Sequence, residues 1–250
     1  MSRTRLFVLV VLTMIAFAGN SLLCRVALKD TRIDPATFTT IRLLSGAIAL
    51  WLIVRVRDRV SVREGNWFSA LALFGYAIAF SLAYTSLPAG TGALLLFGAV
   101  QATMIGYGLW TGERLKPLQI VGLLIAFAGL IALLLPGISA PSPQGTVLML
   151  AAGVGWGVYS LLGRRSVGEP TRTNAGNFMR AAPMTVVLSV LAWPWISIDT
   201  LGVVYAVASG AITSGVGYAI WYTALKGLRA TQAATVQLSV PVIADRKSVV

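Results

Sequence analysis

Long stretches without any charged residue constrain the fold of this chain more than any other feature. One stretch, "LFVLVVLTMIAFAGNSLL", spans Leu6–Leu23, and a second runs from Trp67 to Gly112. A helix crosses the bilayer core in about 20 apolar residues, so the second stretch has the length of two helices joined at the turn "LPAGTG". The chain is 57% hydrophobic and only 11% charged, whereas soluble chains are about 25% charged. The sequence therefore predicts an all-α polytopic membrane protein.

Membrane helices are expected along most of the chain, and a last, shorter apolar stretch runs from Thr231 to Ala244. The expected helices lie at roughly 6–27, 38–54, 67–87, 90–110, 118–135, 146–163, 178–196 and 201–225. The N-terminus also fits a secretory signal, because Arg3, Arg5 and an apolar run precede "AFA" at Ala16–Ala18. The apolar run continues past that point, which favours a helix that is retained.

The lysine and arginine residues between the expected helices fall mostly on one side of the membrane. If the N-terminus is cytoplasmic, the outer segments hold three of them, Arg25, Lys29 and Arg32. The cytoplasmic segments hold thirteen: Arg3, Arg5, Arg55, Arg57, Arg59, Arg63, Arg114, Lys116, Arg164, Arg165, Arg172, Lys226 and Arg229. Because excess positive charge marks cytoplasmic loops, we expect a cytoplasmic N-terminus in the bacterial inner (plasma) membrane. These loops account for the net charge of +12, and no nucleic-acid partner is expected.

The sequence repeats itself at an offset of nearly 140 residues. "FAGNSLLCR" (Phe17–Arg25) aligns with "WGVYSLLGR" (Trp156–Arg164), which begins 139 positions later. The further matches pair Arg42 with Arg180 and Tyr84–Leu87 with Tyr222–Leu225, both at an offset of 138, and Gly92–Met104 with Gln232–Ala244 at an offset of 140. Because these matches occur in the same order at nearly one offset, the chain is expected to hold two copies of one structural unit.

The two copies are expected to have opposite orientations in the membrane. Five helices are expected in the first unit, residues 6–137, and an odd number places the second unit, residues 146–244, upside down. Inverted repeats around a site at the membrane midplane are typical of secondary transporters. Only the non-matching tail "DRKSVV", residues 245–250, follows the second unit. We therefore expect a ten-helix fold with about eight and a half helices present, either as a C-terminal truncation or as a natural variant that borrows a helix from a second protomer in a homodimer.

Several motifs resemble the drug/metabolite transporter superfamily, specifically the EamA-domain permeases. The resemblance rests on the two five-helix halves, on "YTSLPAGTGALLL" between the third and fourth helices, and on "GERLKPLQIVGLLIAFAGLIALLL" at Gly112–Leu135. It covers Leu6 to about Ala244. Similar proteins have ten helices and move small metabolites or drugs. The resemblance implies no covalent chemistry and no cofactor, and its partners are a small-molecule substrate and the lipid bilayer.

Polar and aromatic side chains at helical spacing indicate where a transport path would run. Trp156, Tyr159 and Ser160 share one face of their helix, and Asn20 lies on the matching face of the first helix. Polar side chains are costly against lipid, so we expect these four residues to bind substrate in a cavity between the repeats. Small residues such as Ser160 serve equally well as close-packing positions between helices.

Three further residues within apolar segments are candidates for the same cavity. Gln101 and Gln237 carry amides whose donors and acceptors need partners, either on a neighbouring helix or on a substrate. Tyr218 lies deep on an aromatic face of its helix, and Tyr76 and Phe80 lie on the matching face of the third helix. Because aromatic stripes are more often packing or interfacial belts, only Tyr218 is expected to bind substrate.

Arg42 and Arg180 occupy equivalent positions near the starts of the second and seventh expected helices. One interpretation is that both side chains extend to the nearest lipid headgroups. The other is that they lie at opposite mouths of the pathway, where they attract anionic groups or hold a gate shut by bonding to carbonyl groups.

Two other classes of function remain as alternatives to transport. An integral-membrane enzyme acting on lipid or prenyl groups would need a metal-binding acidic cluster or a nucleophile with a base. The chain has no histidine, and its eight carboxylates lie outside the expected membrane helices. We therefore expect no enzyme activity, no metal and no cofactor. The remaining alternative is a membrane scaffold that transports nothing.

Overall fold

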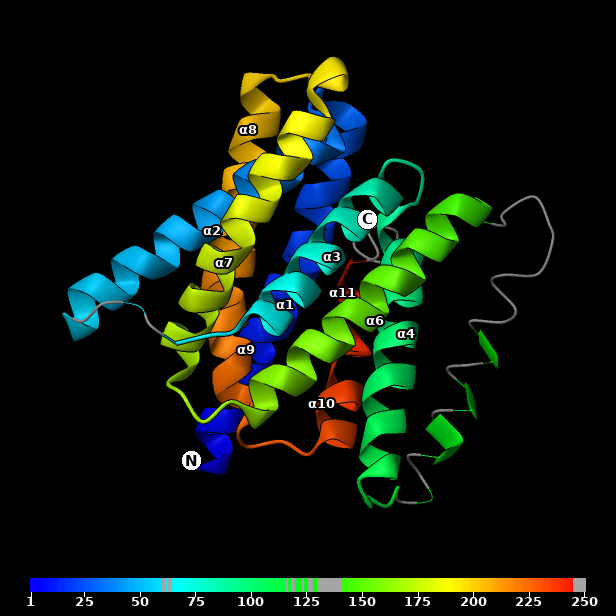
Figure 1. Cartoon of the computed structure of the whole chain (residues 1–250). Helices are drawn as coiled ribbons and strands as arrows, with labels where there is room; N and C mark the ends of the chain where they lie inside the picture. Colours follow the sequence, from blue (N-terminus) through cyan, green and yellow to red (C-terminus); the bar gives the residue numbers. More distant parts are fainter. Residues whose placement is uncertain are drawn as a thin grey trace.

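The computed structural model describes residues 1–59, 62, 64–115, 117, 120–122, 124, 125, 128, 129 and 141–244. The helix expected at 118–135 lies largely outside these residues, and the tail at 245–250 lies wholly outside them. Figure 1 shows that the described part is built from helices that cross the molecule in alternating directions. The structure is therefore that of an all-α polytopic membrane protein.

Four long helices make up the described part of the first half: α1 (Arg3–Asp30), α2 (Pro35–Asp58), α3 (Trp67–Tyr84) and α4 (Ala89–Trp110). The start of α2 is fixed by Asp34, whose carboxylate accepts hydrogen bonds from the backbone N–H groups of Ala36 and Thr37, both at 2.9 Å. Pro35 at the first helical position suits this arrangement, because its fixed φ is helical and it lacks an N–H that would need a partner. These signals start α2 three residues earlier than the expected residue 38.

The second half begins with α6 (Pro143–Arg165) and α7 (Pro170–Leu191), followed by the short 3₁₀ helix η1 (Trp193–Trp195). The segments α8 (Thr200–Val207), η2 (Ala208–Val216) and α9 (Gly217–Leu225) then form one continuous helix, and η2 is its π-helical part.

The last apolar stretch forms two short helices, α10 (Ala230–Val236) and α11 (Ser239–Ala244). They separate at Gln237, four residues before Pro241. Proline has no N–H to donate to the carbonyl group four residues earlier, and its ring clashes with that group. Pro241 therefore explains the interruption of the helix at Gln237.

The seventh helix differs from the expectation in its position. The sequence predicts a helix at 178–196, whereas α7 begins at Pro170 and ends at Leu191. Glu169 caps it by accepting a hydrogen bond from the backbone N–H of Arg172 at 2.8 Å. The first half of α7 is polar, and most of those polar side chains face the protein interior, including the buried Thr173 and Asn174. The expected start at residue 178 is therefore wrong. It rests on hydropathy, whereas the first turns of α7 carry polar side chains that face the protein interior.

Among the described residues, six helices are long and apolar enough to cross a membrane: α1, α2, α3, α4, α6 and the continuous helix Thr200–Leu225. Large apolar side chains remain exposed on their outer faces, as at Ile48, Leu71 and Val147. In a membrane protein these faces contact lipid tails. The chain is therefore a multi-pass membrane protein.

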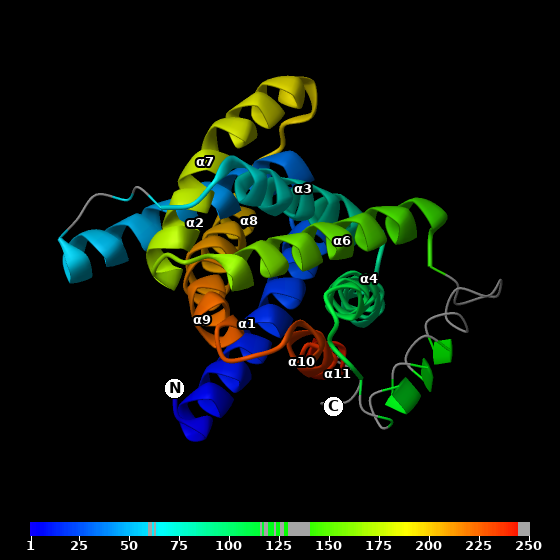
Figure 2. The same ribbon diagram turned by 60° about the horizontal axis from the view of Figure 1, so that its bottom comes forward.

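Helices of the first half pack against helices of the second half. In Figure 2, α6 lies across α3 and α4, and α10 and α11 lie between α1 and α4. The helix α2 packs against both α7 and η2, and α1 packs against α9. The centre of this bundle is therefore surrounded by helices of both halves.

Polar links at one end of the bundle join segments that carry many basic residues. Asp58 accepts a hydrogen bond from Arg172 Nε at 2.7 Å. Glu113 pairs with Arg164 at 3.4 Å, and Lys226 donates to the carbonyl oxygen of Gly168 at 2.6 Å. We call this end the basic end, and the N-terminus lies there in Figure 1.

The opposite end has polar links of its own. Arg25 Nη1 donates to the carbonyl oxygen of Tyr84 at 2.7 Å. The backbone N–H of Ser197 donates to Asp34 at 3.0 Å, and the backbone N–H of Arg32 donates to Asp199 at 3.1 Å. All of these segments are expected outside the cytoplasm. The segments therefore divide between the two ends in the way that the alternating topology requires.

Candidate functional site

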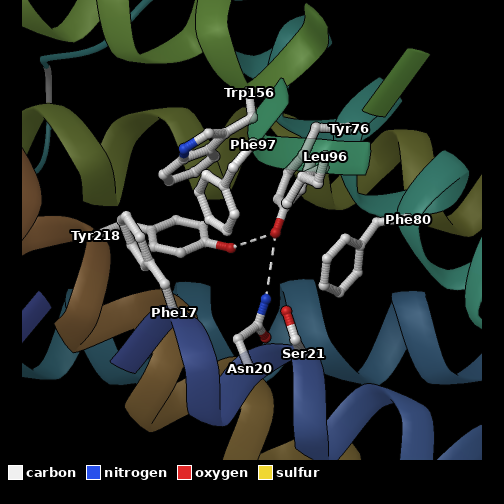
Figure 3. A pocket seen from close by; sticks show the side chains of 9 residues that line it. All are labelled: Phe17, Asn20, Ser21, Tyr76, Phe80, Leu96, Phe97, Trp156 and Tyr218. Atoms are coloured by element: carbon white, nitrogen blue, oxygen red, sulfur yellow. Dashed lines mark hydrogen bonds between the residues drawn. The ribbon is translucent and has the colours of Figure 1, made fainter. Parts of the chain in front are cut away.

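A small cavity lies at the centre of the bundle, between α1, α3, α4, α6 and α9 (Figure 3). Nine residues line it: Phe17, Asn20, Ser21, Tyr76, Phe80, Leu96, Phe97, Trp156 and Tyr218. Its volume is about 10 Å³, roughly what one water molecule needs. A cavity of this volume is too small to hold an organic solute.

Aromatic rings from both halves form the walls of the cavity. The ring centroids of Trp156 and Tyr218 are 4.5 Å apart, and those of Phe17 and Trp156 are 5.1 Å apart in an edge-to-face arrangement. Tyr76 lies 5.1 Å from Trp156 on the other side. Such contacts add to the stability gained from burial alone. The walls offer rigid flat surfaces that suit an apolar or aromatic part of a substrate.

The polar side of the cavity is organised by Asn20, which is 2% exposed. Its Nδ2 donates to the hydroxyl of Tyr76 at 3.2 Å, a contact drawn in Figure 3. Its Oδ1 accepts from Ser209 Oγ at 2.7 Å and from Thr213 Oγ1 at 3.2 Å. These partners assign the orientation of the amide, since the donors face the oxygen. Asn20 therefore joins α1 to α3 and to the second half through η2.

The π-helical segment η2 brings its small polar side chains against the first half. Gly210 lies where η2 crosses α2, and a Cβ atom there would collide with the carbonyl oxygen of Arg42 and with Ser45. Only glycine permits this close approach. The close approach of η2 to α2 places Ser214 next to Arg42. Segments of π-helix occur often at functional sites.

Arg42 lies in the buried core beside the cavity, with no solvent exposure. Its Nη2 donates to the hydroxyl oxygens of Tyr218 at 2.7 Å and Tyr76 at 3.1 Å, and its Nε donates to Ser214 Oγ at 2.9 Å. Its guanidinium carbon is 5.1 Å from the ring centroid of Phe80 and 5.3 Å from that of Tyr76. Three of these four partners line the cavity.

The depth of Arg42 differs from the expectation of a residue at a pathway mouth. Because α2 begins at Pro35, Arg42 lies seven residues inside the helix, about 10 Å from its start. The guanidinium group has no Asp or Glu as an ion-pair partner within the described residues, and its Nη1 makes no hydrogen bond to them. The sequence singles out Arg42 as a candidate. It does not predict how deep Arg42 lies in its helix or that its guanidinium group has no ion-pair partner among the described residues.

Arg180, the repeat partner of Arg42, lies at the basic end. Its Nη1 donates to the carbonyl oxygens of Glu64 at 2.7 Å and Gly176 at 2.9 Å. The side chain is partly buried. The two arginines therefore occupy different environments: Arg42 contacts residues that line the cavity, whereas Arg180 bonds to backbone carbonyl groups at the basic end.

Of the residues expected to bind substrate, Asn20, Trp156 and Tyr218 line the cavity. Gln237 lies behind them, and its Oε1 accepts a hydrogen bond from the indole N–H of Trp156 at 2.8 Å. Gln237 therefore positions one wall without lining the cavity itself.

The other three expected residues are buried away from the cavity lining. Tyr159 donates its hydroxyl hydrogen to Asn174 Oδ1 at 2.6 Å, and Ser160 accepts from the indole N–H of Trp221 at 3.1 Å. Gln101 is 2% exposed, and its Nε2 makes no hydrogen bond to the described residues. In this conformation Tyr159 and Ser160 hold α6 to α7 and α9.

Six lining residues do not belong to the binding set expected from the sequence: Phe17, Ser21, Tyr76, Phe80, Leu96 and Phe97. Tyr76 and Phe80 belong to an aromatic face of α3 that is equally typical of packing. Leu96 and Phe97 lie in a uniformly apolar run, which carries no signal for a cavity. For Phe80 the available signal was its match to Tyr218, which follows it by 138 positions in the repeat.

Within the described residues, no group of three or more His, Cys, Asp or Glu side chains could hold a metal ion. The cavity offers aromatic surfaces, an amide and a set of hydrogen-bond donors. This arrangement is suited to reversible binding of a small amphipathic molecule.

Comparison with known proteins gives one family. The model of the EamA-like transporter family matches residues 5–135 and 143–244. An uncharacterised protein of Pseudomonas aeruginosa is 54% identical over 241 residues, which cover 96% of this chain and 84% of that protein.

Two more distant similarities concern a named exporter and a solved structure. The aromatic amino acid exporter YddG of Ancylobacter novellus is 27% identical over 144 residues, which cover 52% of this chain and 50% of that protein. A crystal structure of a protein with 21% identity superposes with a TM-score of 0.77, covering 99% of this chain and 89% of the other. At that identity the match shows the fold alone.

Proposed function

This chain belongs to the EamA-like transporter family, and from that premise we propose that it is a secondary transporter of small organic metabolites or drugs, working by alternating access. The observation that carries the proposal is the small central cavity, which is lined by residues of both halves and has a volume of about 10 Å³. A binding site that holds its substrate between two halves must open to one side at a time. The central cavity is the proposed substrate site.

The packing of the helices supports an inverted relation between the two halves. The pairing of α3 with α6 has a counterpart in the pairing of the continuous helix α8–η2–α9 with α1. The pairing of α4 with α6 has a counterpart in that of α11 with α1. An exchange of equivalent elements of this kind is what a pseudo-two-fold axis between repeats produces.

A second support comes from Arg25 and Arg164, which are equivalent in the repeat. Arg25 donates to the carbonyl oxygen of Tyr84 at the end of α3. Arg164 donates from Nε to the carbonyl oxygen of Leu228, just after α9, at 3.0 Å. The two arginines thus tie equivalent chain segments at opposite ends of the bundle. These ties would have to loosen in turn as one end or the other opens.

Orientation and location follow from the charge distribution. Among the described residues, the basic end brings together segments assigned to the cytoplasm, including those of Arg57, Arg164, Arg172 and Lys226. The positive-inside rule then favours a cytoplasmic basic end, with the N-terminus on that side, in the bacterial inner membrane.

The substrate class is proposed from the walls of the cavity. Phe17, Phe97, Trp156 and Tyr218 suit a solute with a flat apolar part. The name of the Ancylobacter relative, an aromatic amino acid exporter, is consistent with such a solute.

Reconstituted vesicles test the transport proposal. Purified protein in sealed liposomes should exchange a labelled aromatic solute against an unlabelled internal pool, and protein-free liposomes give the passive leak. Trp156→Ala and Asn20→Ala should lower the exchange rate strongly, whereas Leu71→Ala on the exposed face of α3 should leave it close to wild type. If no aromatic solute exchanges above the leak, or if Trp156→Ala and Asn20→Ala exchange normally, the cavity is not a transport site.

A further inference from the structure

Resting on the proposed transport function, we propose that the substrate is a small organic monoanion whose carboxylate binds Arg42 and whose apolar part lies against Trp156 and Phe17. The cavity and Arg42 together form this site, with the hydroxyl groups of Tyr76 and Tyr218 between them.

Arg42 is a buried charge without a counter-ion among the described residues. Guanidinium groups remain protonated in proteins, and Arg42 has no solvent exposure. None of the described carboxylates forms an ion pair with it. A charge inside the membrane region is costly and tends to mark a pathway for substrate or ions. An anion that binds beside Arg42 would remove that cost, which gives the site a strong preference for negative charge.

The cluster around Arg42 holds more hydrogen-bond donors than acceptors. Both lone pairs of the Tyr76 hydroxyl oxygen accept hydrogen bonds, one from Asn20 Nδ2 and one from Arg42 Nη2. The contact of 3.0 Å between the two tyrosine hydroxyls must then run from Tyr76 to Tyr218, because Tyr76 has no lone pair left. The hydroxyl hydrogen of Tyr218 consequently has no acceptor among the described residues.

The guanidinium group of Arg42 also has donors without acceptors. Its Nε and Nη2 hydrogens are engaged with Ser214, Tyr76 and Tyr218. The hydrogens on Nη1 have no acceptor in the described part of the chain. Together with the Tyr218 hydroxyl, the cluster offers an excess of donors and lacks acceptors. A carboxylate supplies acceptors only and carries the opposite charge, so it is the complementary group.

The charge of the ligand is limited by the charge of the site. The cation that meets the cavity lining is the single guanidinium group of Arg42, which contacts Tyr76, Tyr218 and Phe80. A carboxylate of charge −1 neutralises it. A phosphate monoester carries about −1.5 to −2 charges at neutral pH and would leave a buried excess of negative charge. The site therefore favours a carboxylate over a phosphate.

A purely structural role for Arg42 is the competing explanation. In that case Arg42 only ties α2 to α3, η2 and α9 through its three hydroxyl partners, and ligand charge has no influence on binding. The two explanations differ in one measurable property, which is whether affinity depends on the charge of the ligand and on Arg42 together.

Binding to the purified wild-type protein in detergent is the first test. The probes are 3-phenylpropionate, its neutral analogue 3-phenylpropionamide, and phenyl phosphate, which share a phenyl group and differ in charge. A ligand that binds only the folded protein raises the midpoint of thermal unfolding. We expect 3-phenylpropionate to reach its half-maximal shift at a concentration at least about tenfold lower than 3-phenylpropionamide or phenyl phosphate. The reason is that a hydrogen bond to a charged group contributes enough free energy for a tenfold change in affinity.

Equal or tighter binding of the amide overturns the proposal, as does the absence of any shift with 3-phenylpropionate. Tighter binding of phenyl phosphate overturns the assignment of a carboxylate.

Variants of Arg42 form the second test. Arg42→Gln should abolish the preference for 3-phenylpropionate over the amide, and Arg42→Lys should keep part of it, because lysine retains the charge but not the planar fork. Arg55→Gln is the matched control, since it removes an exposed arginine from the same helix and should bind as wild type does. If Arg42→Gln folds and keeps the preference, Arg42 is not the anion site. The probe series on the wild-type protein decides the question even if Arg42→Gln does not fold.

The same proteins in liposomes separate this inference from the transport proposal. If wild-type vesicles exchange 3-phenylpropionamide above the leak of protein-free vesicles but not 3-phenylpropionate, transport stands and the anion site is wrong. If the protein in detergent binds 3-phenylpropionate through Arg42 but its vesicles exchange neither probe, the anion site stands and transport is wrong.

Discussion

The indole Nε1 of Trp156 donates a hydrogen bond to Oε1 of Gln237 at 2.8 Å, across 81 positions of sequence. Gln237 is held in turn by its Nε2, which donates to the carbonyl oxygen of Ala233 at 2.9 Å. One wall of the cavity thus takes its position from the place where α10 ends. Gln237→Leu should leave the buried indole N–H without a partner, at a cost of about 1–3 kcal/mol in stability, and should lower the exchange rate. Thermal unfolding and vesicle exchange measure the two effects.

Gln101→Leu provides the contrast for that experiment. Gln101 is equally buried, but its Nε2 has no hydrogen-bond partner within the described residues. Removal of a buried amide whose N–H groups have no partner among the described residues should be neutral or stabilising. Loss of stability in Gln101→Leu equal to that in Gln237→Leu would show that the hydrogen bond to Trp156 is not the cause.

The crossing of α2 and η2 should be intolerant of any side chain at Gly210. A Cβ there collides with backbone and side-chain atoms of α2, and overpacking of this kind costs about 1–3 kcal/mol. We expect Gly210→Ala to lower both membrane abundance and the unfolding temperature. Gly106→Ala is the control, because a Cβ at Gly106 meets no atom within 4 Å. Its stability should equal or slightly exceed that of wild type, and a loss as large as in Gly210→Ala would contradict the packing argument.

Glu113 should give the basic end a stability that depends on pH. Burial alone would raise the pKa of its carboxyl group. The backbone N–H groups of Thr231 and Ala230, both at 3.1 Å, and the charge of Arg164 lower the pKa by more than burial raises it. The pKa of Glu113 is therefore below the ordinary 4.5. The folded state therefore favours the ionised form. The stabilisation is complete well above pH 4.5 and is lost as the pH falls through the lowered pKa.

The measurement is the difference in unfolding temperature between wild type and Glu113→Gln across pH. We expect the difference to be largest near neutral pH and to shrink in the acidic range below about 4.5. The wild type should be the more stable protein wherever a difference remains. A difference that stays constant with pH would mean that the carboxylate charge contributes nothing.

Reporter fusions check the proposed orientation. A reporter that is active only outside the cytoplasm should be silent when fused between Arg55 and Asn66 and active when fused between residues 136 and 145. The reason is the excess of basic residues at one end of the bundle. Activity in the first segment would reverse the orientation of the whole molecule, since the polar links fix which segments share an end.

The sequence predicts the fold class well, because long apolar runs and turn residues are local signals. It also places Asn20, Trp156 and Tyr218 at the cavity, because the repeat aligns faces that look toward a common centre. The start of α7 is missed because hydropathy cannot distinguish a polar loop from a polar helix whose side chains face inward.

The environment of Arg42 could not be predicted from the sequence at all. Its partners Tyr76, Ser214 and Tyr218 come from three other elements, and their meeting depends on the close approach at Gly210. The lining by Leu96 and Phe97 is likewise a result of packing, since neither residue differs from its apolar neighbours in sequence.

The distance in sequence between Arg42 and its later partners has a consequence for the synthesis of the protein. Ser214 and Tyr218 follow Arg42 by 172 and 176 residues, which the ribosome adds in roughly 10–35 s at 5–20 residues per second. During that interval the nascent α2 carries a charged side chain for which two of the three hydrogen-bond partners, Ser214 and Tyr218, do not yet exist. Early insertion of α2 must therefore rely on water, lipid headgroups or the insertion machinery to solvate the guanidinium group, and the first half can reach its mature burial only after the ribosome has completed the second.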